Sequence, residues 1–105
     1  MNIKKEIANQ KRRDESVSSK VRIEFHDDKA QTVFLGGTFH EWRPEATPMI
    51  QLGEGRWRKE LMLSPGRYEY RLVVDGEWRT DPAALDQVLN PHGDFNSILK
   101  VETAP

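Results

Sequence analysis

The chain contains no cysteine, so a disulfide framework, a thiolate metal site and a cysteine nucleophile are excluded. The lack of disulfides favours a cytoplasmic protein, which is the location we predict. No apolar run approaches the ~20 residues that a membrane-spanning helix needs, so the sequence predicts neither a membrane partner nor a signal-peptide core. The 105 residues suffice for one domain but not for a (β/α)₈ barrel, which needs about 200.

Charge is distributed unevenly along the chain. Residues 1–20 hold six Lys or Arg and three Asp or Glu, whereas the remainder is acidic and the whole carries a net charge of −1. A mildly acidic domain argues against nucleic acid as a partner. The basic cluster 11–13 either touches phosphate or lipid or is simply solvated, and the second is the commoner outcome. We predict a flexible basic leader over 1–19 and a single domain over 20–102.

Apolar residues beyond the leader alternate with polar ones, which is typical of half-buried strands. The clearest stripe consists of Tyr68, Tyr70, Leu72 and Val74. We predict about seven strands, at 21–25, 31–35, 49–52, 57–63, 68–74, 77–80 and 97–101, with a long loop over 83–95. Short strands at this spacing predict an all-β protein, an antiparallel β-sandwich of the immunoglobulin-like type.

The dipeptide Asp75-Gly76 predicts a two-residue hairpin of type I′. Such a turn fixes the register, and the expected pairs are Val74 with Glu77, Val73 with Trp78, Leu72 with Arg79, and Arg71 with Thr80. Because the stripe faces the core and paired residues share a face, the alternate residues project outward. The outer face of this hairpin is therefore predicted to carry Arg71, Val73, Trp78 and Thr80.

The three tryptophans differ in their predicted surroundings. Trp57 shares the parity of Leu61 and Leu63, so we expect it in the core. An outward Trp78 offers a flat apolar platform that matches the C–H face of a pyranose, with donors from a neighbouring arginine. The alternative is that Trp78 packs under the loop that follows or caps a sheet edge. Trp42 lies in an irregular segment, and the sequence leaves open whether it covers the core or forms a second platform.

Four stretches in order then carry a resemblance to a known family. They are residues 33–42 (VFLGGTFHEW), 65–71 (PGRYEYR), 74–82 (VDGEWRTDP) and 96–101 (NSILKV). Over residues 20–102 the chain resembles the glycogen-binding module of the AMP-activated protein kinase β subunit, within carbohydrate-binding module family 48. The resemblance implies an early-set immunoglobulin-like β-sandwich that binds α-1,4-linked glucan such as glycogen, starch or maltooligosaccharides.

The resemblance also implies which residues bind. Trp42 and Trp78 stand where the family stacks two consecutive glucose rings, Arg71 where a basic residue bonds sugar hydroxyls, and Asn96 where an asparagine does the same. His92 occupies the position of a leucine that threads into the ligand in the kinase module, so an apolar contact is replaced by a polar ring. A glycogen-metabolism enzyme or a kinase-type protein is the protein partner that the resemblance suggests.

The sequence predicts no catalytic residue, no metal and no cofactor. His26, His40 and His92 lack metal-ligand spacing, and no serine or glycine-rich segment has the context of a nucleophile or phosphate loop. A different class of function stays open, namely a protein-interaction or regulatory module of the same fold that does not bind carbohydrate. Tethering of the basic leader to an acidic membrane is a third, weaker possibility.

Overall fold

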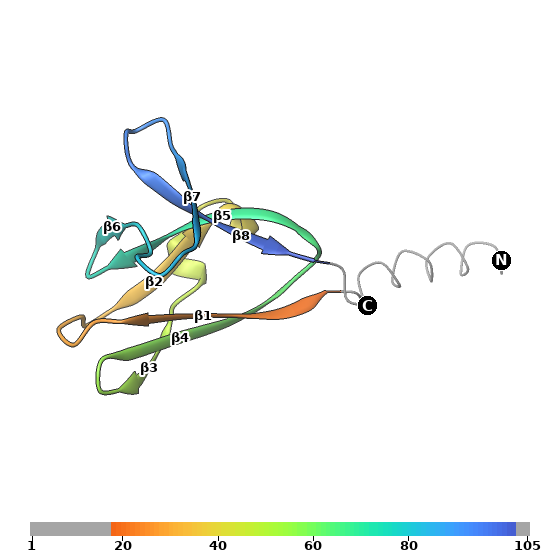
Figure 1. Cartoon of the computed structure of the whole chain (residues 1–105). Coiled ribbons are helices and arrows are strands. Elements are labelled where there is room, and N and C mark those ends of the chain that lie inside the picture. Colours follow the sequence, from red (N-terminus) through yellow and green to blue (C-terminus); the bar gives the residue numbers. More distant parts are fainter. Residues whose placement is uncertain (1–17, 103–105) are drawn as a thin grey trace, which may run out of the picture.

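A computed structural model describes residues 18–102, which form two antiparallel sheets packed face to face (Figure 1). One sheet has the order β1-β4-β3 and contains β1 (Ser19–His26), β4 (Arg56–Leu63) and β3 (Ile50–Gly53). The other has the order β2-β5-β8-β7, with β6 paired to β5. Its strands are β2 (Val33–Gly37), β5 (Gly66–Val74), β6 (Glu77–Arg79), β7 (Asp86–Leu89) and β8 (Phe95–Val101). The predicted all-β sandwich is confirmed.

Two short 3₁₀ turns, η1 (Thr38–His40) and η2 (Pro44–Ala46), lie in the connection from β2 to β3. No helix in the part of the chain from 18 to 102 is long and apolar enough to cross a membrane. The predicted leader over 1–19 falls outside the described residues, apart from its last two positions.

The prediction of a loop throughout 83–95 is wrong, because β7 lies within it and brings the strands to eight. Strand β7 is four residues long and pairs only with β8, at the edge of its sheet. Val88 is half-buried while the other three residues are exposed, so the segment shows no sustained alternation. A short edge strand of this kind is held by backbone pairing rather than by a buried face, and periodicity does not reveal it.

The core lies between the two sheets and is built from the predicted stripes. Leu35 and Leu72 are fully buried, and Val33 and Val74 nearly so. Burying one such side chain stabilises the fold by roughly 1.5–3 kcal/mol relative to leaving it exposed. Trp57 is also buried, which confirms its assignment to the core.

A buried polar pair ties the segment after β6 to the centre of β5. The Tyr70 hydroxyl donates to Oδ2 of Asp81, which is itself buried, and Oδ1 of Asp81 accepts the backbone N–H of Ala83 at 3.0 Å. Burial and the adjacent carboxylate raise the pKa of Tyr70, so the hydroxyl stays protonated and keeps donating. The sequence identified Asp81 only as a turn residue.

The hairpin register is confirmed for three of its four expected pairs, which are Val74 with Glu77, Val73 with Trp78, and Leu72 with Arg79. The fourth is wrong, because β6 ends at Arg79 before Thr80 is reached. Val73 does occupy the outer face, but it is buried there rather than exposed. Its cross-strand neighbours, Phe34 and Trp78, flank it on both sides and exclude water.

The turn itself also anchors the connection between β1 and β2. Asp75 and Gly76 have φ of 49° and 86°, as a type I′ turn requires. The Asp75 carboxylate accepts the backbone N–H groups of Gln31 and Thr32 at 2.8 and 2.9 Å. These two hydrogen bonds favour the charged form and hold the pKa of Asp75 below its ordinary value of 3.8.

We expect Asp75→Asn to reduce the decrease in folding stability that occurs as the pH falls into the acid range. Since the pKa of Asp75 is lowered by folding, the unfolded chain binds this proton more readily, and stability present above the ordinary pKa is lost as pH falls through the lowered one. Asparagine tolerates positive φ and accepts hydrogen bonds without titrating. Thermal unfolding between about pH 5 and pH 3 should show a smaller decrease in Tm for the variant.

Glu77→Gln in the same hairpin is the matched control, because Glu77 is exposed and accepts no backbone N–H. In Glu77→Gln the Tm should fall with decreasing pH as steeply as in the wild type. Equal slopes for wild type and Asp75→Asn would contradict the proposed role of the turn carboxylate.

Candidate functional site

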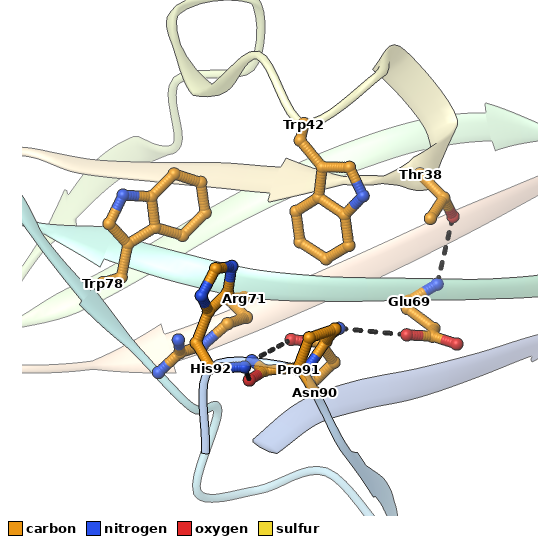
Figure 2. A pocket seen from close by; sticks show the side chains of 9 residues that line it. Thr38, Trp42, Glu69, Arg71, Trp78, Asn90, Pro91 and His92 are labelled. Atoms are coloured by element: carbon orange, nitrogen blue, oxygen red, sulfur yellow. Dashed lines mark hydrogen bonds between the residues drawn. The ribbon is translucent and has the colours of Figure 1, made fainter. Parts of the chain in front are cut away.

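A pocket of about 710 Å³ opens on the outer face of the sheet that contains β5 (Figure 2). All five residues singled out from the sequence line it, namely Trp42, Arg71, Trp78, His92 and Asn96. They come from the β2–β3 connection, β5, β6, the β7–β8 turn and β8, so segments far apart in sequence meet here. Sequence reasoning missed four further lining residues, which are Thr38, Glu69, Asn90 and Pro91.

The two tryptophan rings of the pocket lie side by side. Their centroids are 6.4 Å apart and their planes are inclined at 54°. Trp78 is 43% exposed and Trp42 is half-buried, so neither is enclosed in the core. Trp42 lines the pocket and is not among the partly buried side chains packed against the core, so of its two predicted positions it occupies the one beside Trp78.

Trp42 is positioned by an unusual stretch of backbone. Glu41 and Trp42 both have left-handed conformations, with φ of 61° and 60°. The Trp42 N–H donates to the carbonyl of Gly37 at 2.8 Å and closes the turn. Left-handed backbone costs a residue with a Cβ roughly 1–2 kcal/mol, so other contacts of this segment must offset it. The result is an indole directed toward the pocket (Figure 2).

Trp78 is positioned by close contact with Gly36 of β2, a strand that pairs with β5 on the edge opposite to β6. A Cβ built on Gly36 would lie 2.5 Å from both Cη2 and Cζ3 of the indole, closer than atoms can approach. The ring therefore rests directly on the β2 backbone, where only a glycine leaves room. Trp78 thus packs against the sheet itself, and part of the ring stays exposed in the pocket.

Arg71 lies beneath the rim of the pocket with its side chain only 11% exposed. Its Nη1 atom is 3.6 Å from Oδ2 of Asp94, and its Nε–H is buried without a hydrogen-bond partner among the described residues. Guanidinium is always charged and carries five N–H donors. The side chain therefore retains donor capacity at the pocket.

Asn96 is buried and is joined to two other lining residues. Its Nδ2 donates to Oε1 of Glu69, and its Oδ1 accepts from Nδ2 of Asn90, both at 3.0 Å. Asn90 in turn accepts the backbone N–H groups of His92 and Asp94 through Oδ1, at 2.9 and 3.1 Å. These bonds hold the β7–β8 turn, which carries the exposed His92, at the edge of the pocket (Figure 2).

Glu69 is the only carboxylate among the residues that line the pocket. Hydrogen bonds from Asn96 and from Arg67 favour its charged form and lower its pKa below the ordinary value. A glycosidase needs two carboxyl groups, one with a raised pKa that can donate a proton. Glu69 has the opposite property. In addition, residues 18–102 contain no group of three His, Asp or Glu side chains that could hold a metal ion.

Residues 19–105 match the family model described as the glycogen recognition site of AMP-activated protein kinase. The chain belongs to this family.

Curated relatives of this chain include FLOURY ENDOSPERM 6 from rice, a chloroplastic protein 38% identical over 72 residues. The match covers 69% of this chain and 13% of that protein. The β-1 subunit of 5'-AMP-activated protein kinase from pig is 30% identical over 70 residues, covering 67% of this chain and 54% of the subunit. The chain thus spans a small part of the first relative and about half of the second.

Among solved structures, a maltogenic amylase from S. marinus resembles the chain with a TM-score of 0.67 and 22% sequence identity. The likeness covers 81% of this chain and 14% of the amylase. It shows that the two share a fold.

We expect Gly36→Ala to displace Trp78, because the new methyl group and the indole cannot occupy the same space. Overpacking of this kind costs about 1–3 kcal/mol. Chemical denaturation should show that loss, and near-UV circular dichroism should show a changed tryptophan signal. In a Trp78→Ala background the same glycine substitution should cost little, because the obstructing ring is gone. An equal cost in both backgrounds would mean that the glycine is needed for another reason.

Proposed function

We propose that this chain is a non-catalytic module that binds α-1,4-linked glucan by stacking consecutive glucose rings on Trp42 and Trp78. The observation that carries the proposal is the pair of accessible indoles lining one pocket, 6.4 Å apart and inclined at 54°. An α-1,4-glucan curves, so its neighbouring rings are themselves inclined and suit tilted rather than parallel platforms. Membership of the glycogen-recognition family supports the same ligand class.

In this proposal the polar lining residues orient the sugar. Arg71 supplies donors to the hydroxyl groups that ring the stacked glucose, and Asn96 supplies its remaining donor and acceptor. His92, on the exposed turn, contacts the next glucose units of the bound glucan. The site is shallow and open to solvent, so we expect a Kd in the range of about 1 µM to 1 mM, or roughly −8 to −4 kcal/mol.

The absence of catalysis is part of the proposal. Glu69 is hydrogen-bonded and ionised, and no second carboxylate lines the pocket to act with it. The glycogen-metabolism or kinase-type partner and the cytoplasmic location stay predictions. Of the two relatives named above, the pig protein is a subunit of a kinase, whereas the rice protein is named as chloroplastic rather than cytoplasmic.

Trp78→Ala and Trp42→Ala should each weaken binding of maltoheptaose by about ten-fold or more, because a central aromatic anchor contributes more than a rim contact. Isothermal titration calorimetry measures this directly. Met62→Ala is the control, since Met62 is 63% exposed on the opposite sheet and should leave affinity unchanged. Unaltered affinity in both tryptophan variants would refute the stacking site.

Native electrophoresis in gels with and without glycogen separates the two classes of function. Retardation of the wild-type chain by the polysaccharide, lost in Trp78→Ala, is the expected result. A wild-type chain that migrates identically in both gels would favour the protein-interaction module instead.

A further inference from the structure

Asn96 cannot adopt an arbitrary orientation in the pocket, because both ends of its amide are already engaged. Its Nδ2 donates to Glu69 and its Oδ1 accepts from Asn90. A primary amide has two N–H donors and two lone pairs on oxygen. One donor and one lone pair therefore remain for a ligand, and their direction is set by the neighbours rather than by the sugar.

Glu69 is itself held by two further hydrogen bonds. Its backbone N–H donates to Oγ1 of Thr38 at 3.1 Å, and its Oε2 accepts from Nη1 of Arg67 at 2.8 Å. The carboxylate lies on β5, next but one to Arg71, and its side chain is 26% exposed. With Oε2 held by Arg67, Oε1 is presented to Asn96 in one orientation. The lowered pKa agrees with a carboxylate that stays charged, which makes it the stronger acceptor.

Asn90 contacts the other end of the Asn96 side-chain amide, its oxygen. Its backbone N–H donates to the carbonyl of Asp94 at 2.7 Å, and its Oδ1 accepts two backbone N–H groups of the turn. Its Nδ2 then joins the turn to Asn96. The chain of contacts runs from Arg67 through Glu69, Asn96 and Asn90 to the turn that carries His92.

We propose that Glu69 is a positioning residue of the glucan site, which acts by orienting Asn96 and not by touching the sugar. This inference rests on the proposed function. Two other roles for Glu69 make different predictions. A direct contact with glucose would act independently of Asn96, and a purely structural role would lower stability without changing affinity in the folded protein.

A double-mutant cycle on the full chain separates these roles. We would titrate maltoheptaose into wild type, Glu69→Ala, Asn96→Ala and the double variant, with near-UV circular dichroism to confirm folding. Glu69→Ala should weaken binding by about five-fold or more in the wild-type background. In the Asn96→Ala background the same substitution should change the affinity by less than about two-fold, because the residue it orients is gone.

Two further variants sharpen the test. Glu69→Gln retains an oxygen that can accept from Asn96 Nδ2, so it should restore most of the affinity lost in Glu69→Ala. If Glu69→Ala does not fold, Glu69→Asp takes its place in the cycle, because the shorter side chain withdraws the acceptor from Asn96. Glu60→Ala is the control, since Glu60 is an ion-paired carboxylate on the opposite sheet and should leave affinity unchanged.

Several results would overturn the proposal. If the fold-loss in affinity of the double variant equals the product of the losses in Glu69→Ala and Asn96→Ala, the two residues act independently and Glu69 contacts the glucan directly. If Glu69→Ala binds as tightly as wild type, Glu69 has no role in binding. In both cases glucan binding by the wild type would stand. Only a wild-type chain that fails to bind maltoheptaose would remove the proposed function and the positioning role together.

Discussion

The geometry of the pocket depends on the contact between the Trp78 indole and the backbone at Gly36. Because Gly36 has no side chain, the aromatic ring packs directly against the backbone of the sheet, and this contact restricts the positions that the ring can adopt. Trp78 is fixed in this way although it is almost half exposed. Exposed side chains usually lose conformational freedom when they bind, and a ring already held in place has less to lose.

The charges around the pocket are paired within the protein. Glu69 is matched by Arg67, and Arg71 is within ion-pair distance of Asp94. The lining is therefore close to neutral overall while still offering hydrogen-bond donors and acceptors. Such a surface suits an uncharged ligand rich in hydroxyl groups better than a phosphate or a nucleic acid, which agrees with the proposed ligand class.

Much of the fold follows from local signals in the sequence. A two-residue turn at Asp75 leaves one register for the hairpin, and that register placed Arg71 and Trp78 on one face. The same alternation also directs Glu69 outward, since it lies two residues from Arg71, so its place in the pocket was present in the pattern. Its bond to Asn96 was not, because a contact between β5 and β8 depends on strand order. Val73 shows a further limit, since parity gives the direction of a side chain but not what covers it.

The remaining lining residues come from segments without periodicity. Thr38 belongs to a 3₁₀ turn, and Asn90 and Pro91 to the turn after an edge strand that the alternation did not predict. The positions of Thr38 and Asn90 are set by tertiary hydrogen bonds, so residue type alone gives no indication of them. Asn96 and His92 likewise lie in no pattern that directs them to the pocket. They were predicted only from the resemblance to the family.

The two indoles are held by different parts of the molecule. Trp78 is set into the sheet, whereas Trp42 sits at the start of a surface connection in which every residue from 41 to 46 is exposed or half-buried. A substitution there acts on the position of the Trp42 ring, whereas the Trp78 ring is held separately by the β2 backbone. In the proposed glucan site, the angle between the two platforms is therefore set at the β2–β3 connection, while the sheet fixes only one of them.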